Sequence, residues 1–192
     1  HENFSRQLSS YLSGILRVFC EVSVLQIEEQ SYFEYNNALP DTALIGLLNF
    51  TPANKRFSDG TFILDVATSI GYFMIDRLLG GQGAGYNLSR NFTDIEIAIL
   101  DNVMKRIVGF LGDAWRNYLD VDIGLNSLET NARLLQALAP EDIVVIVVLG
   151  IKLGNNVEGN LNICIPAEFL EQVMHTFSMR YARSSKKQDP TQ

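Results

Sequence analysis

The chain has 192 residues, with 15 Lys and Arg against 22 Asp and Glu and a formal net charge of −7. Hydrophobic residues make up 47% of it, enough to bury a core, which excludes an intrinsically disordered protein. The pI near 4.8 argues against nucleic acid as a partner, because phosphate contacts need a basic surface. The strongest apolar run, Ile143–Ile151, is too short to span a bilayer, so no direct membrane insertion is expected.

The charge is unevenly distributed along the chain. Residues 180–192 carry four basic side chains and one acidic one, a balance of +3, which leaves −10 for the other residues. This basic segment is polar and has no apolar periodicity, so we expect a linker or tail that follows a domain of residues 1–179. The chain opens with His1 and without a signal-peptide pattern, and its two ends together suggest a piece of a longer protein.

The first half of the chain predicts a helix, three strands and a second helix. Apolar residues at three-and-four spacing mark the first helix, namely Phe4, Leu8, Tyr11, Leu12, Ile15, Leu16 and Phe19. A strand is expected near Val22–Val24, and two more over Ala43–Phe50 and Phe62–Val66. The connection between the last two is too short for a helical crossover, so their pairing should be antiparallel. Ser69–Leu79 then has helical spacing.

The second half repeats this order of elements. Thr93 and Glu96 form a capping-box pattern in front of a long apolar stripe, which predicts a helix that begins after Thr93. Strands are expected at Val121–Ile123, Ile143–Ile151 and Val157–Ile165, the last two joined through a Gly-Asn-Asn turn. Apolar residues in 167–177 have helical spacing, which predicts a helix at the end of this half.

The two halves match at an offset of about 99–100 residues, which indicates an internal duplication. Gly60–Val66, for example, aligns with Gly159–Ile165, and the turn at Pro40 aligns with the turn at Pro140. We therefore expect half-repeats of approximately residues 4–90 and 91–179 within one domain. The predicted fold is α+β, a central and mainly antiparallel sheet flanked by helices with approximate two-fold symmetry.

The sequence holds few residues suited to catalysis or metal binding. Its two histidines, His1 and His175, have no neighbours that would form a triad or a metal site. Cys20 and Cys164 lie in apolar surroundings without a CxxC pattern, so we interpret both as small buried core residues. We expect no catalytic residue, no metal and no cofactor.

The Gly-rich segment Gly80–Gly85 (GGQGAG) stands out between the helix predicted to end near Leu79 and the helix that begins after Thr93. A phosphate-binding loop follows a strand, opens directly into a helix and usually supplies a Lys, whereas these glycines follow a predicted helix and no Lys comes after them. Two interpretations remain open. Gly80 could end the helix in a left-handed C-cap, or the glycines could leave a backbone that a partner protein approaches closely, with Ile75, Leu78 and Leu79 as an apolar rim.

The segment Phe73–Gly83 (FMIDRLLGGQG) and the following Phe92–Glu96 (FTDIE) resemble the middle domain of the FliM family of flagellar motor switch proteins. Ala114-Trp115 and Asn162–Pro166 fit the same pattern, and the likeness covers nearly the whole chain. The resemblance implies the internally duplicated α/β/α fold that this family shares with the chemotaxis proteins CheC and CheX.

The resemblance also implies partners and a site. In the family the GGxG loop docks onto the rotor protein FliG, which assigns FliG binding here to Gly80, Gly81, Gln82 and Gly83. Neighbouring FliM subunits would stand beside this domain in the switch ring (C-ring), a cytoplasmic assembly peripheral to the inner membrane at the flagellar basal body. The domain would relay chemotaxis signals that set the rotation direction, while CheY and FliN would bind segments outside this chain.

Some proteins with the CheC fold are enzymes, and they suggest the alternative function. It is that of a CheC-type phosphatase, which acts on the phospho-aspartate of CheY. Its pattern needs a Glu and an Asn near the start of each long helix. The second helix has Ala98 and Asp101 at these positions, and the first has Ser9 and Leu12. Phosphatase activity is therefore not expected. A third hypothesis is a dimerising module that uses an exposed sheet edge or helix face.

Overall fold

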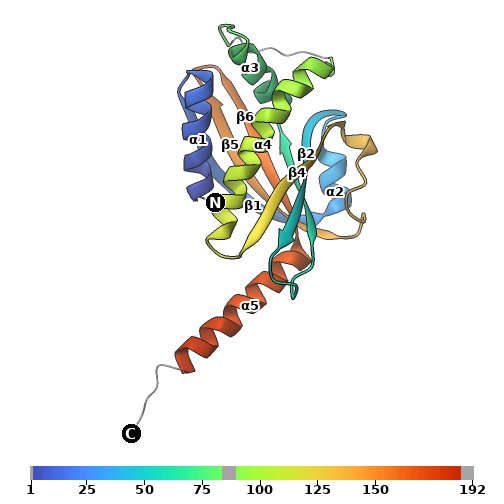
Figure 1. The fold of residues 1–192 in the computed structure, drawn as a ribbon. Helices are drawn as coiled ribbons and strands as arrows, with labels where there is room; N and C mark the ends of the chain where they lie inside the picture. Colours follow the sequence, from blue (N-terminus) through green and yellow to red (C-terminus); the bar gives the residue numbers. More distant parts are fainter. Residues whose placement is uncertain (1, 84–89, 187–192) are drawn as a thin grey trace.

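The computed structural model describes residues 2–83 and 90–186. Within them, the strands are β1 (Cys20–Ser31), β2 (Thr42–Pro52), β3 (Gly60–Val66), β4 (Val121–Asn131), β5 (Ile143–Leu153) and β6 (Val157–Pro166). The helices are α1 (Glu2–Leu16), α2 (Tyr32–Ala38), α3 (Thr68–Leu78), α4 (Asp94–Arg116) and α5 (Ala167–Lys186), with a short 3-10 helix η1 (Ala132–Leu134). The strands form one antiparallel sheet, which confirms the α+β class and both predicted antiparallel pairings (Figure 1). None of the described helices is long and apolar enough to cross a membrane.

The sheet has an approximate two-fold axis at its centre. Its strand order is β1-β5-β6-β3-β2-β4, so the first strand of each half pairs with the second strand of the other half. β3 and β6 meet in the middle, where Leu64 lies opposite Ile163. These two residues occupy equivalent positions in the predicted repeat. The predicted two-fold relation between the halves is therefore confirmed.

Both edge strands carry a β-bulge at equivalent positions. The pairing of β1 with β5 skips Leu25, and the pairing of β4 with β2 skips Asn126. Each bulge lies five residues after the first paired residue of its strand, Cys20 in β1 and Val121 in β4. The duplication thus extends to an irregularity that hydrophobic patterning does not predict, because a bulge is a property of backbone pairing.

The two faces of the sheet bury separate apolar clusters. Leu64 and alternating strand residues face α1, α3 and α4, which cover one side of the sheet (Figure 1). Ile63 and Cys164 belong to the second cluster on the other face, together with Tyr35 of α2. Cys20 and Cys164 are both buried free thiols, as predicted, and burial raises the pKa of each.

The last helix departs from the internal symmetry. α3 stops at Leu78, whereas α5, which follows β6 in the same way, continues to Lys186 and projects from the rest of the domain (Figure 1). Helical spacing in the sequence reaches only Phe177, because an apolar stripe ends where a helix leaves the core. Residues 178–186 contain no Gly or Pro that would stop the helix. The basic segment therefore begins as helix. Its role as a linker stays a prediction, and residues 187–192 lie outside the described part of the chain.

α4 begins with the predicted capping box. Thr93 Oγ1 accepts a hydrogen bond from the Glu96 amide at 3.3 Å, and Glu96 Oε1 accepts one from the Thr93 amide at 2.8 Å. Because Thr93→Ala removes the first bond, we expect it to lower the free energy of unfolding by about 1 kcal/mol, measured by urea denaturation. Ser10→Ala changes an exposed hydroxyl within α1 and serves as the control, with an expected change below about 0.5 kcal/mol. Equal losses in the two variants would contradict the capping role of Thr93.

Candidate functional site

The candidate site is the GGQG loop, defined here as Gly80, Gly81, Gln82 and Gly83. It directly follows α3, at the end of the helix layer away from α5 (Figure 1). Ala84 and Gly85, which complete the Gly-rich segment, lie outside the described residues.

The loop begins with a Schellman C-cap of α3. Gly80 has a φ of +91°, in the left-handed region. Its amide donates to the Arg77 carbonyl at 3.1 Å, and the Gly81 amide donates to the Asp76 carbonyl at 2.7 Å. These two bonds satisfy carbonyls at the helix end that have no partner within the helix. The interpretation of Gly80 as a left-handed C-cap is confirmed.

Asp76 holds the far end of the loop. Its Oδ2 accepts a hydrogen bond from the Gly83 amide at 2.7 Å. The backbone of Gly81 passes so close to this carboxylate that an added Cβ would overlap it. Gly83 has a φ of +76°, and a Cβ there would come within 2.8 Å of the Phe73 ring. Gly83 is therefore required by its backbone and packing, and a side chain at Gly81 would displace the Asp76 carboxylate that holds the loop.

This internal requirement changes the interpretation of the glycines. The sequence leaves open whether they end a helix or let a partner approach the backbone closely. A glycine-rich pattern alone cannot distinguish access for a partner from a backbone that packs against its own helix. A substitution such as Gly81→Asp would displace the loop as well as alter its surface. The accessible features are instead side chains. Of the expected apolar rim, Ile75 is buried, Leu78 is only partly exposed and Leu79 is 70% exposed, while Gln82 is also exposed.

Arg77 joins the loop to the end of α1. Its Nη1 donates to the Gly81 carbonyl at 3.1 Å, its Nε to the Leu16 carbonyl at 2.8 Å and its Nη2 to the Arg17 carbonyl at 3.1 Å. The guanidinium thereby caps α1 at its last residue and holds the loop at the same time. Sequence spacing does not reveal this contact, because α1 and α3 are separated by three strands along the chain.

A hollow beside the loop is bounded on one side by an ion pair. Arg90 donates to the two carboxylate oxygens of Glu96 at 2.6 and 3.0 Å, and lies 5.4 Å from the centre of the Tyr72 ring. These hydrogen bonds from Arg90 lower the pKa of Glu96 to about 2, so the pair remains charged near neutral pH. The hollow therefore combines apolar side chains with a fixed charge pair, and its lining includes Tyr72, Ile75, Leu79, Gly80, Gly81, Arg90 and Glu96.

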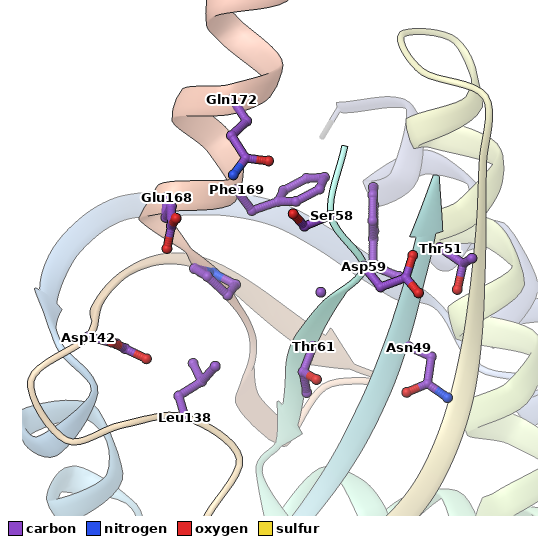
Figure 2. Close-up of a pocket in the computed structure, with 13 residues that line it drawn as sticks. Asn49, Thr51, Ser58, Asp59, Thr61, Leu138, Asp142, Glu168, Phe169 and Gln172 are labelled. Atoms are coloured by element: carbon purple, nitrogen blue, oxygen red, sulfur yellow. The ribbon is translucent and has the colours of Figure 1, made fainter. Parts of the chain in front are cut away.

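A second hollow lies where α5 leaves the sheet (Figure 2). Asp59, Asp142 and Glu168 contribute carboxylates to its lining, and Phe169 contributes an aromatic ring. Asp142 Oδ2 accepts a hydrogen bond from the Ala139 amide at 3.1 Å, so this carboxylate stabilises the turn that contains it. The described lining contains no His or Cys that could serve as a base or nucleophile, and the described residues hold no cluster of metal-ligating side chains. This hollow is therefore a weaker candidate than the GGQG loop.

The three hydrogen bonds of Arg77 lead to a test of loop positioning. We expect Arg77→Met to lower the free energy of unfolding by about 1–3 kcal/mol, because it leaves several carbonyls without their charged donor. Amide hydrogen exchange should accelerate both in the GGQG loop and in the last turn of α1. Arg6→Met, at an exposed position of α1, is the control and should change neither quantity. Faster exchange in the loop without any change at the end of α1 would contradict the coupling.

Comparison with known proteins identifies the family. The family model described as "Flagellar motor switch protein FliM" matches residues 1–182. The chain is 28% identical over 190 residues to FliM of Bacillus subtilis, which covers 99% of the chain and 55% of that protein. It is 31% identical over 191 residues to FliM of Treponema pallidum, covering 100% and 54%. The chain thus spans about half the length of these curated relatives.

Solved structures agree with this result. FliM in the crystal structure of a FliG–FliM complex from Helicobacter pylori superposes with a TM-score of 0.83 and 31% identity, covering 91% of this chain and 93% of that one. CheX from Vibrio vulnificus, at 10% identity and a TM-score of 0.55, shares the fold alone and covers 84% and 95%. The predicted fold of the CheC and CheX group is confirmed. The chain belongs to the FliM family of flagellar motor switch proteins.

Proposed function

We propose that this chain is a non-enzymatic component of the flagellar motor switch that binds FliG through the GGQG loop, at Gly80, Gly81, Gln82 and Gly83. The observation that carries the proposal is the internal fixation of the loop by Asp76 and Arg77, next to an exposed Leu79. A loop held by its own hydrogen bonds loses little conformational entropy on binding, so more of the contact energy remains as affinity. Support also comes from the FliM relative in Helicobacter pylori, which was crystallised in complex with FliG.

The wider role follows from the same proposal. The domain would stand beside neighbouring FliM subunits in the C-ring, on the cytoplasmic side of the inner membrane at the flagellar basal body. It would relay chemotaxis signals that set the direction of rotation. Because the chain spans about half of its relatives' length, CheY and FliN are assigned to segments outside it. FliG is the partner assigned to the described surface.

Leu79 is suited to test this assignment because its side chain is mostly exposed and can be changed without disturbing the core. We expect Leu79→Asp to weaken binding of FliG at least tenfold in isothermal titration calorimetry, since a carboxylate at the centre of an apolar contact loses its hydration. Leu134→Asp is the matched control, because Leu134 is 77% exposed and belongs to η1 rather than to the helices around the loop. Equal affinities for both variants and the unmodified chain would refute the site.

The described helices oppose the alternative phosphatase function at the two required positions of each long helix. On α4, Asp101 forms an ion pair with Lys105 at 2.6 Å, and Ala98 has no group that could orient a water molecule. On α1, Ser9 donates to the first carbonyl of β1 at 2.6 Å, and Leu12 is buried in the core. The side chains of Ser9 and Leu12 are thus engaged in holding the fold, and Asp101 is paired within its own helix.

A phosphatase assay tests the non-enzymatic part of the proposal. We expect the chain to leave the decay rate of phosphorylated CheY unchanged, because the Glu and Asn that orient the attacking water are missing. An active CheC-type phosphatase serves as the positive control for the same CheY preparation. A concentration-dependent acceleration of phosphate release by this chain would show that the proposal is wrong on this point.

A further inference from the structure

Asp65 is a charged residue buried in the middle of the sheet. It belongs to β3, one residue beyond the Leu64–Ile163 pair at the two-fold axis, and only 6% of its surface is exposed. Its side chain lies on the face covered by α2, where the surrounding cluster is otherwise apolar or aromatic. Burial of a carboxylate is unfavourable unless it is paired or neutralised, so this position calls for a physical explanation.

Two neutral donors from different parts of the chain converge on this carboxyl group. Tyr35 Oη, from α2, donates to Asp65 Oδ2 at 2.5 Å. Asn162 Nδ2, from β6 in the second half, donates to Asp65 Oδ1 at 3.0 Å. The cluster thus connects α2, the first half of the sheet and the second half through one side chain. It lies on the opposite face from the helices that carry the GGQG loop, and it is independent of the proposed FliG site.

The groups that face Asp65 supply hydrogen bonds but no positive charge. Tyr35 comes from α2, and Asn162 and Cys164 come from β6, while Tyr32 of α2 lies beside Tyr35 in the same cluster. Burial raises the pKa of Asp65 to about 6, and the hydrogen bonds from Tyr35 and Asn162 offset only part of that effect. Burial also raises the pKa of both tyrosines and of Cys164, so these groups stay neutral over the same pH range. Asp65 is therefore the group in this cluster that changes charge.

The cluster also contains an acceptor for the proton. Asn162 Oδ1 is buried and accepts no hydrogen bond from any described residue. A protonated Asp65 becomes a donor on one oxygen and needs an acceptor. Rotation of the Asn162 amide by half a turn would place its Oδ1 where its Nδ2 now meets Asp65. The neutral carboxyl could then donate to Asn162 while it still accepts from Tyr35.

We propose that Asp65, Tyr35 and Asn162 form a proton-dependent clasp, which holds α2 and the two halves of the sheet together more tightly when the carboxyl takes up a proton from solvent. A carboxyl whose pKa is higher in the folded than in the unfolded chain binds its proton more tightly when folded. Stability therefore increases as the pH falls from about 6 toward the unfolded value near 3.8, and the gain is lost as the pH rises again. Most surface carboxylates that form ion pairs have the opposite effect.

A direct titration of Asp65, in the unmodified chain and in Tyr35→Phe, tests the clasp. The carboxyl carbon of Asp65 in the unmodified chain, followed by NMR across pH 4 to 8, should show a midpoint near 6. Tyr35→Phe keeps the ring but removes a donor to the ionised form, so the midpoint should move to higher pH. A midpoint near 4, or one that Tyr35→Phe leaves unchanged, would overturn the proposal.

Stability measurements test the consequence for the fold. We compare urea denaturation of the unmodified chain and of Asp65→Asn, which carries a permanently neutral amide at the same place. The folding equilibrium constant of the unmodified chain, relative to this variant, should rise about 30-fold between pH 7.5 and 4.5. Asp59→Asn, which changes an exposed carboxylate in the β2–β3 connection, should keep the pH dependence of the unmodified chain. Parallel profiles for the unmodified chain and Asp65→Asn would refute the clasp.

Hydrogen exchange distinguishes tightening of α2 from a general change in stability. Protection factors of the amides in residues 32–38 should rise when the pH falls from 7 to 5.5 in the unmodified chain and stay constant in Asp65→Asn. These factors are corrected for the intrinsic pH dependence of exchange. Equal changes in both chains would contradict a specific effect on α2.

Discussion

The pairing of β3 with β6 is the interaction on which the rest of this structure depends. Each half alone would leave one side of its hairpin open, with unpaired backbone groups along β3 or β6. The two strands close this gap by pairing around Leu64 and Ile163, and β1 and β4 then each complete the sheet of the other half. Only this exchange gives a continuous surface wide enough for α1, α3 and α4 to cover. The sheet therefore needs both halves of the chain.

The last helix of each half ends in a different way, and this difference creates the candidate site. Both closing helices follow a central strand and begin in the core. Gly80 stops α3 through its left-handed backbone, and Asp76 and Arg77 then fold the chain back against the helix layer. No such residue interrupts α5, which projects from the domain up to Lys186. One repeat unit thus supplies a fixed loop and the other an extended helix.

Most of the fold was predictable from sequence, and the reasons for the exceptions are physical. Hydrophobic periodicity, the capping box at Thr93 and the short connections between strands predicted the four longer helices, the six strands and the two hairpin pairings, since these signals are local. The short helix α2 and the pairing of strands from different halves were not predicted. The part that Arg77 plays at the candidate site was not predictable, because its contacts join segments far apart in the chain. The clustering of Asp65 with Asn162 depends likewise on strand register. The glycine content located the GGQG loop and the resemblance assigned it to FliG, but the reason for glycine at Gly81 became apparent only from the nearby carboxylate.

The paired bulges at Leu25 and Asn126 have a consequence for how copies of this domain can associate. An extended edge strand invites another chain to add a strand, and a bulge disturbs the regular spacing of donors and acceptors that such an addition needs. β1 also exposes Glu21, Glu28 and Glu29 along its length, which repel an acidic neighbour. The bulges and these carboxylates thus make a regular backbone ladder between the edge strands of two copies less favourable. In the proposed assembly, contacts between neighbouring copies would then fall on helices and loops, which can shift without breaking a backbone ladder.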